Sequence, residues 1–488
     1  MKHAPRLLPF AAILVIASSW VCVADEYQAR LERVDALYRD GAYGQAKAEL
    51  DELVSVLPSN PVVLRWRGTV ALALGELTDA IKYLKASLAR DPESAVSCNN
   101  LGTAYLRSNM AEPAAEQFET ATRLEPAGFE GHYNLGAVLS RLGQYEKASG
   151  SYEKALEIRP QDFGALVGYG RALEASGDTK NAILQYELAR TTAPDNAGLV
   201  QTLGALYADL GNHTKAIAMY SEAIKLDSSN TAAHLQLGAV LYRQGEYEQA
   251  AERFSMAAAT ATDKFVAYFN LGQTLCVMQK FDEALAAYDN ALEADPTSVA
   301  AYEQMGLLYM KGQQWDKAAE ALEAAAALEP DNRSVLASLA ACYASAGDEA
   351  KTLRQRESIV ARFPDDADAH RRLAALYFKL ELHDEALREY LYALTLKPGD
   401  AQAHNNIGLI YLSRDNLSAA GVHLQSAIEA DPGNLYAINN LGVTLERKGK
   451  TDLAVEQYRK ALQIDAGFGP AASNLERLGE SDVAASSG

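Results

Sequence analysis

The chain has 488 residues, a formal net charge of −19, 33 glycines, 15 prolines and four cysteines. This length exceeds what one hydrophobic core usually holds, so the sequence predicts several domains or an array of repeats. The acidic charge argues against a general affinity for nucleic acid or for anionic lipid. Abundant apolar residues and few prolines exclude a collagen-like or largely disordered chain.

The first 24 residues have the composition of a secretory signal peptide. Lys2 and Arg6 form a short basic start, residues 7–21 are mostly apolar, and Ala24 precedes the first acidic residue. This pattern predicts cleavage after Ala24 and export to the periplasm or the cell exterior. Two alternatives stay open, namely an uncleaved signal anchor and a lipid on Cys22, although Ser-Trp-Val before that cysteine suits lipoprotein processing poorly.

Cleavage would change the formal charge to −21, because the removed segment carries two basic residues and no acidic one. No later segment reaches the roughly 20 apolar residues of a membrane-spanning helix, so no span is predicted in the mature chain. Cys98, Cys276 and Cys342 are far apart and form no CxxC pair, which indicates small core residues rather than disulfides or a zinc site.

A period of 34 residues runs through the chain. Counted from Tyr27, thirteen repeats end at Phe468 without an insertion or a deletion. Position 8 of the repeat is glycine in ten repeats, position 20 is alanine in twelve, and ten of the 15 prolines stand at position 32. Such regular placement indicates an array of supersecondary units that stack on their neighbours.

Each repeat predicts two antiparallel helices. Positions 4, 7, 8 and 11 form one apolar face of a first helix, a glycine near position 15 ends it, and positions 20, 24 and 27 form the face of a second helix. In the repeat at 129–162, Gly136 and Ala148 lack bulk, so the helices can approach closely while Tyr152 fills the adjoining space. Pro160 then ends the second helix, because proline has no N–H to continue the hydrogen-bond ladder.

These spacings resemble the tetratricopeptide repeat, whose pattern is Leu-Gly-x2-Tyr followed by Ala, an aromatic residue, Ala and Pro. The resemblance covers residues 27–468 and departs from the family mainly in lacking its frequent Trp at position 4. It implies an all-α, right-handed α-solenoid of about thirteen helix-turn-helix units. Residues 469–479 are interpreted as a C-terminal capping helix and residues 480–488 as a disordered tail.

Asparagines recur at position 6, inside the first helix, where their amides compete with the backbone for hydrogen bonds. On a helical wheel this position lies nearly opposite the apolar face. The resemblance implies that this surface lines a concave groove, where amides can bind the main chain of an extended peptide. The alternative is that the amides bond to neighbouring repeats or face water. The predicted groove asparagines are Asn100, Asn134, Asn270, Asn406 and Asn440.

Position 13 is basic in seven repeats and lies two helical turns, roughly 10 Å, beyond position 6. A groove more positive than the outer surface would suit the carboxylates of a peptide or an acidic glycan. The alternative is that each cation complements the dipole of its helix end. The groove candidates from this set are Arg107, Arg141, Arg243 and Arg447.

Histidine stands at position 4 in four repeats and is interpreted as a core residue, because a whole helix pair separates one histidine from the next and a metal needs ligands about 2 Å away. The repeat at 333–366 departs furthest from the pattern. Ala340 replaces glycine, Thr352 replaces alanine, and Arg356 stands where an aromatic residue should pack. The sequence leaves open whether the array loosens here or a partner covers the site.

The sequence therefore predicts a non-enzymatic scaffold, without cofactor or metal, that binds an extended peptide or protein segment, with acidic segments and acidic glycans as further ligands. The alternative function is a periplasmic scaffold for cell-envelope polysaccharide or secretion machinery. A third, the regulatory arm of an enzyme such as a glycosyltransferase, is disfavoured because about twenty residues follow the last repeat.

Export is predicted to leave Asp25 as the first residue of the mature chain, because the small Ala24 closes the apolar segment. The intact mass of the protein from its native host checks this. A mass that includes Met1 would support the anchor, and a lipid on Cys22 would support lipoprotein processing.

Overall fold

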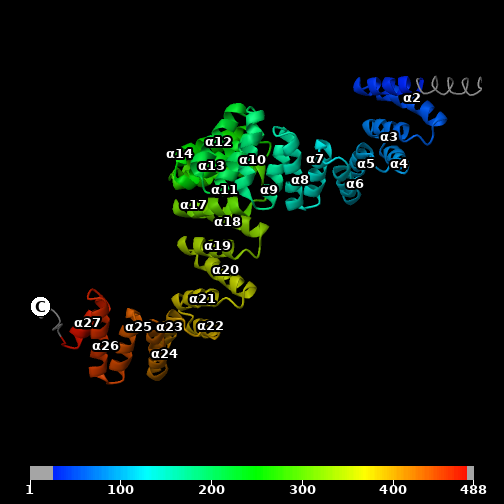
Figure 1. Cartoon of the computed structure of the whole chain (residues 1–488). Helices are drawn as coiled ribbons and strands as arrows, with labels where there is room; N and C mark the ends of the chain where they lie inside the picture. Colours follow the sequence, from blue (N-terminus) through cyan, green and yellow to red (C-terminus); the bar gives the residue numbers. More distant parts are fainter. Residues whose placement is uncertain (1–25, 481–488) are drawn as a thin grey trace, which may run out of the picture. The chain divides into compact units, whose positions relative to one another are not determined.

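The computed structural model describes residues 26–480. The predicted signal peptide at 1–24 and, apart from Glu480, the predicted disordered tail lie outside these residues. Within the described range the protein is all-helical, and Figure 1 shows helices that follow one another in pairs along the chain. The predicted all-α solenoid of helix-turn-helix units is confirmed. In the same range, no helix combines the length and the apolar character that crossing a membrane requires.

The first helices begin at position 1 of the repeat and end at position 13 or 14, apart from the shorter final helix. Residues 26–39 are helical as well and precede the first of the labelled helices. The first helices are α3 (Pro61–Leu74), α5 (Ala95–Arg107), α7 (Phe129–Arg141), α9 (Phe163–Ala175), α11 (Ala197–Asp209), α13 (Thr231–Gln244), α15 (Phe265–Val277), α17 (Val299–Lys311), α19 (Arg333–Ser345), α21 (Ala367–Lys379), α23 (Ala401–Ser413), α25 (Leu435–Arg447) and α27 (Gly469–Arg477).

The second helices begin at position 17 and, except for α4, end at position 30. They are α2 (Tyr43–Val56), α4 (Leu77–Leu88), α6 (Ala111–Leu124), α8 (Tyr145–Ile158), α10 (Thr179–Thr192), α12 (His213–Leu226), α14 (Tyr247–Thr260), α16 (Phe281–Ala294), α18 (Trp315–Leu328), α20 (Glu349–Arg362), α22 (His383–Leu396), α24 (Leu417–Ala430) and α26 (Thr451–Ile464).

Local side chains set where the first helices begin and end. Position 34 is the N-cap, and Asn60, Asp162 and Asn230 each accept a hydrogen bond there from a backbone N–H of the next helix. These bonds satisfy N–H groups that have no partner within the helix. Position 15 adopts the left-handed conformation, in which glycine is unstrained, yet five repeats have another residue there, among them Asn109 (φ 62°) and Asp415 (φ 58°).

The two helices of a repeat meet at positions 8, 20 and 24. A Cβ added at Gly170 would lie 2.7 Å from the Tyr186 ring, and one at Gly442 would lie 2.5 Å from the Tyr458 ring. Alanine at position 20 is fully buried in every repeat that has it, among them Ala148. At these glycines a larger residue would therefore force the ring or the helix pair to shift, and a bulky residue at position 20 would push the helices apart.

The described residues fall into two compact parts, one ending at Arg253 and the other beginning at Phe254. Within each part the core is a series of local clusters. Buried side chains between residues 31 and 70 form one cluster in the first part. Buried side chains between residues 412 and 475 form another cluster in the second part. Each cluster joins neighbouring repeats only, as expected where a repeat buries its apolar faces against the next one along the chain.

Helix α27 lies where the sequence places a capping helix. Ala471 and Leu475 of this helix are buried in the cluster that also holds Tyr458. Its Asn474 donates through Nδ2 to Asn439 Oδ1 of the preceding repeat at 3.0 Å. The divergent repeat at 333–366 also keeps the usual helix bounds, in α19 and α20.

Ala148→Trp is expected to lower the stability of the array by about 1–3 kcal/mol, because the indole would have to enter the packed interface between α7 and α8. Thermal unfolding followed by circular dichroism measures this loss.

Gly150→Ala is the matched control, since Gly150 is exposed on the same helix and an added Cβ meets no atom within 4 Å. This change should stabilise α8 by roughly 0.5–1 kcal/mol through helix propensity. Equal melting temperatures for the two variants would contradict the packing described for position 20.

Candidate ligand-binding face

The asparagines at position 6 lie half-buried between the first helices of consecutive repeats, which run side by side. Asn134 donates through Nδ2 to Asn99 Oδ1 at 2.9 Å, and Asn440 donates in the same way to Asn405 Oδ1 at 3.0 Å. In both cases the amide at position 6 bonds to an amide at position 5 of the preceding repeat. The structure thus places these two amides in contacts between repeats.

Two other predicted asparagines also donate to the preceding repeat. The amide of Asn100 donates to Thr69 Oγ1 at 2.9 Å, and that of Asn406 donates to Tyr390 Oη at 2.7 Å. Asn270 is half-buried in α15. The single-helix wheel places position 6 away from the core because it considers one helix, whereas the adjacent repeat covers part of that surface.

The sequence reasoning missed the residues at position 5 that accept these bonds. Asn99 and Asn405 have this role for position 6 of the following repeat, and Asn439 has it for Asn474. The available signal was the recurring Asn-Asn doublet, since a second amide next to the first supplies an acceptor for the next repeat along the chain.

The predicted arginines at position 13 are exposed, and two of them reach the end of the preceding first helix. Arg107 Nη1 donates to the Leu72 carbonyl at 2.6 Å, and Arg447 Nη1 donates to the Leu412 carbonyl at 2.8 Å. The last carbonyls of a helix have no partner within it and carry its negative dipole end. The predicted dipole interaction is therefore present, but with the helix of the adjacent repeat.

Two of these arginines also bind the side chain at position 15 of the preceding repeat, where the backbone is left-handed. Arg141 donates to Asn109 Oδ1, and Arg447 pairs with Asp415 Oδ1 at 2.9 Å. Arg243 is exposed near Tyr220, whose pKa is raised to about 12, mainly by burial and then by the Asp209 carboxylate, while Arg243 opposes the shift.

The histidines at position 4 bond to the turn before their own helix. His132 and His370 are buried, and their Nε2 atoms donate to the carbonyls of Pro126 and Pro364 at 2.9 Å and 3.0 Å. In residues 26–480, no group of three or more His, Cys, Asp or Glu side chains could hold a metal ion.

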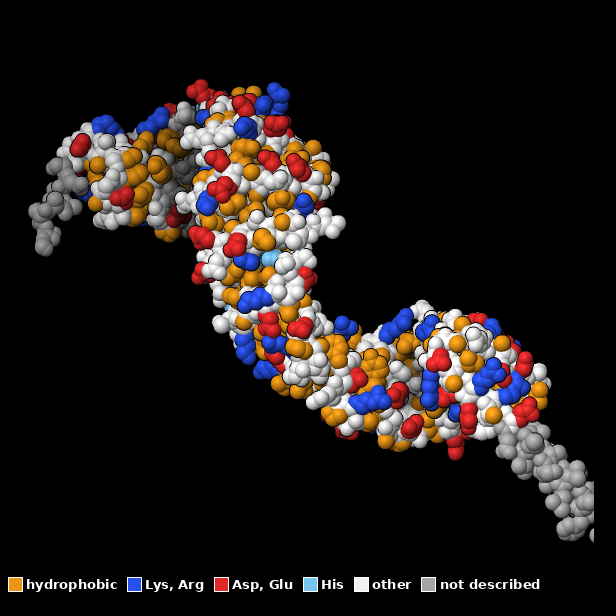
Figure 2. All heavy atoms as spheres, turned by 90° about the horizontal axis from the view of Figure 1, so that it is seen from above, with side chains coloured by type: hydrophobic (Ala, Val, Ile, Leu, Met, Phe, Trp, Pro, Cys, Tyr) orange, Lys and Arg blue, Asp and Glu red, His pale blue; other side chains and the backbone are white. Residues whose placement is uncertain are grey.

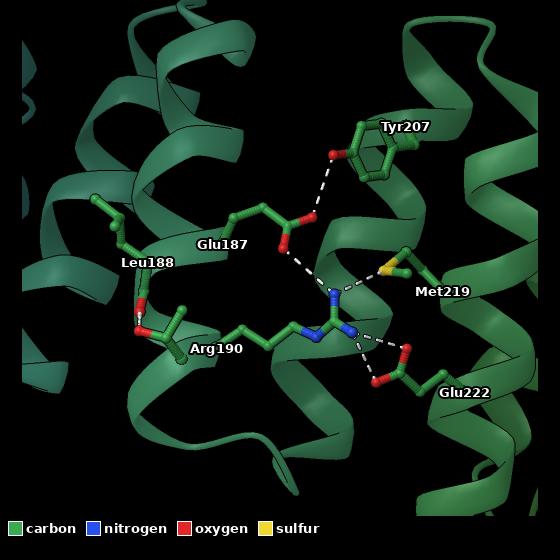
Figure 3. Close-up of polar contacts among 7 residues, drawn as sticks. Glu187, Leu188, Arg190, Tyr207, Met219 and Glu222 are labelled. Carbon is green, nitrogen blue, oxygen red and sulfur yellow. Dashed lines mark hydrogen bonds and ion pairs between the residues drawn. The ribbon is translucent and has the colours of Figure 1, made fainter.

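Polar contacts also join the second helices to the next repeat. Figure 3 shows Arg190 between two carboxylates, with Nη2 3.0 Å from Glu222 Oε1 and Nη1 3.3 Å from Glu187 Oε2. Tyr207 in α11 donates to Glu187 Oε1 at 3.2 Å. Tyr377 and Glu357 repeat this contact at 2.8 Å between the same repeat positions, so it belongs to the stacking of repeats.

Two hollows open between consecutive first helices. The N-terminal hollow, of about 660 Å³, lies between α9 and α11 and is lined by Val167, Arg171, Tyr186 and Thr202 among others. The C-terminal hollow, of about 340 Å³, lies between α19 and α21. The two hollows use equivalent positions of the repeat, including 5, 9 and 24 of one repeat and 2, 3 and 6 of the next. Position 6 therefore lines both.

The visible surface carries no field of a single charge. Figure 2 shows acidic and basic side chains interspersed with hydrophobic ones.

Family models match most of the described chain. The model described as Cilia and flagella-associated protein 70 C-terminal domain matches residues 151–409. Models described as tetratricopeptide repeat match residues 31–95, 95–127, 129–162, 401–434 and 435–468. The last three ranges coincide with repeats counted from Tyr27.

Among curated proteins, the TPR repeat-containing thioredoxin TTL4 of Arabidopsis thaliana is 34% identical over 80 residues. The match covers 16% of this chain and only 12% of that relative.

Two solved structures are similar over different shares of the chain. MamA from Desulfovibrio magneticus RS-1 is 28% identical, with 34% of this chain and 94% of that chain covered and a TM-score of 0.33. The C-terminal part of a TPR repeat-containing protein from Cytophaga hutchinsonii is 18% identical. The match covers 49% of this chain and 99% of that chain, with a TM-score of 0.46. Because the family match at 151–409 spans more than half of the 488 residues, the chain belongs to the family described as Cilia and flagella-associated protein 70 C-terminal domain, and it is a tetratricopeptide-repeat protein.

Proposed function

We propose that this protein is a non-enzymatic scaffold that binds an extended segment of a partner protein along the face formed by its first helices. The observation that carries this proposal is the opening of hollows at equivalent places of the repeat, one in each compact part of the chain. Each hollow combines apolar walls with a few polar groups, which is the usual make-up of a recognition site.

The amides at position 6 support the same face. Asn134 and Asn440 each commit Nδ2 to the preceding repeat, and in the described part of the chain neither Oδ1 atom accepts a hydrogen bond. An amide oxygen has two lone pairs and can accept an N–H from an extended main chain. The bond between repeats would then orient each amide for the ligand, so its structural role and its binding role are compatible.

Export is part of the proposal and rests on residues 1–24. The family description names cilia and flagella, which is said of the family and not of this chain. Fractionation of native cells tests export. Detection of the chain in the periplasm or in the medium would support it, and detection inside the cell would contradict it.

Thr202→Trp is expected to weaken partner binding by about tenfold, which corresponds to about 1.4 kcal/mol, because the indole would occupy the N-terminal hollow. Partners are captured with the mature chain from native extracts and compared quantitatively by mass spectrometry between parent and variant.

Leu184→Trp is the matched control, since Leu184 is exposed on the second helix α10 and also receives an indole without a change of charge. Partners retained equally by the parent and both variants would argue against binding at this face.

The double variant Asn134→Ala, Asn440→Ala separates the two roles of the amides. Loss of each bond between repeats should lower stability by about 1 kcal/mol, partly offset by the better helix propensity of alanine. Thermal unfolding without ligand measures the structural role. Calorimetric titration with a captured partner segment then measures binding, and an unchanged affinity at a temperature where both proteins are folded would limit the amides to structure.

A further inference from the structure

One repeat carries a charged residue where all others place a large apolar or aromatic side chain. Position 24 is Leu, Phe or Tyr in twelve of the thirteen repeats, and these side chains are buried. In the repeat at 333–366 the position holds Arg356, while Ala340 at position 8 and Thr352 at position 20 stay buried. A guanidinium is charged at every physiological pH, so this helix pair has a cation beside its core.

The guanidinium of Arg356 extends from α20 to the next repeat. Its Nη1 donates to the backbone carbonyl of Arg372, which occupies position 6 in α21. The same two positions also meet where Tyr390 contacts Asn406 at 2.7 Å. Arg356 and Arg372 are thus neighbours through a regular contact of the array, and both side chains line the C-terminal hollow.

Small residues leave space in front of the two arginines. Ala337, Ala340, Ala341 and Ala369 line the C-terminal hollow of about 340 Å³. An aromatic ring at position 24 would pack against position 8, whereas the arginine points on toward α21. The hollow can therefore admit the end of one acidic side chain, whose carboxylate occupies far less than this volume.

Neither of the two arginines forms a close ion pair with a carboxylate. Across residues 26–480, neither Arg356 nor Arg372 has a carboxylate oxygen within 4.0 Å. The carboxylates at the rim have other partners, since Asp366 pairs with Arg333 at 3.2 Å and Asp368 pairs with Arg371 at 2.9 Å. Burial, and then the charge of Arg372, lower the pKa of Arg356, as expected for a cation lacking a counter-charge.

We propose that Arg356 and Arg372 form a subsite for one carboxylate of an acidic segment of the partner protein. This rests on the proposed scaffold function and names the chemistry recognised at one place on its first-helix face. The planar fork of a guanidinium matches a carboxylate with two parallel N–H donors. The carboxylates of Asp366 and Asp368 at the rim favour a singly charged group over phosphate.

The test uses the mature chain and three short labelled peptides of otherwise equal sequence in a fluorescence anisotropy titration at low salt. One peptide has a central Glu and a C-terminal amide, one has Gln and an amide, and one has Gln and a free C-terminal carboxylate. The parent should bind the Glu peptide about tenfold more tightly than the Gln amide, the effect expected of a charge-assisted hydrogen bond. Preference for the free carboxylate instead would support the subsite with a chain terminus as its ligand.

Arg356→Leu and Arg372→Asn should each remove this preference. Both changes restore residues found elsewhere in the array, such as Leu322 at position 24 and Asn406 at position 6, so both variants should melt no lower than the parent. Arg388→Leu is the control, because it removes the same charge from an exposed site that pairs with Glu385 outside the hollow. This variant should retain the preference.

Equal binding of all three peptides by the parent, or a carboxylate preference that survives Arg356→Leu, would overturn the subsite. Competition by inorganic phosphate as strong as that by the Glu peptide would also overturn it, since phosphate would then be the better ligand. These outcomes concern the subsite alone. If Thr202→Trp weakens partner capture, the scaffold function stands even when the subsite fails. If Thr202→Trp leaves partner capture unchanged, the scaffold function is rejected whatever the peptides show.

Discussion

The close approach of position 8 to the side chain at position 24 determines the geometry of nearly every repeat. At Gly102, Gly204 and Gly272, an added Cβ would lie 2.7 Å from an aromatic ring of the second helix. The backbone of the first helix is therefore in direct contact with a ring, and alanine at position 20 lets the second helix pack equally closely. Because this contact recurs every 34 residues, helix bounds recur with it, and the same faces are presented to the next repeat.

Directional bonds add to the apolar packing between neighbouring repeats. The amide pair Asn134–Asn99 joins first helices, the arginine Arg447 binds the Leu412 carbonyl at the helix end, and Glu187 receives Tyr207 from the next repeat. The residues that each bond joins are separated by 20 to 35 residues along the chain. These bonds act between neighbours only, which agrees with the nearest-neighbour energetics of such arrays.

The fold could be predicted from the sequence because its determinants are local and repeated. Gly136, Ala148 and Pro160 mark a close contact and a helix end by their size or covalent geometry alone. The partners of the position-6 amides could not be predicted in this way. The helical wheel describes one helix, whereas the bond from Asn440 to Asn405 depends on the offset between two repeats, which the stacking sets. Likewise, the helix-end role of Arg107 was expected within its own helix and occurs on the preceding one.

The same stacking explains why the array accepts Arg356. In an isolated helix pair, a guanidinium at position 24 would lie against apolar residues without a polar partner, at a cost of several kcal/mol. In the array, position 24 lies next to position 6 of the following repeat, where Tyr390 finds Asn406 and Arg356 finds the Arg372 carbonyl. The carbonyl accepts one of the hydrogen bonds that the guanidinium can donate, but as a neutral group it does not neutralise the positive charge. Position 24 can thus change from a packing residue to a cation that is available to an external anion, while α19 and α20 keep their bounds and Thr352 stays buried.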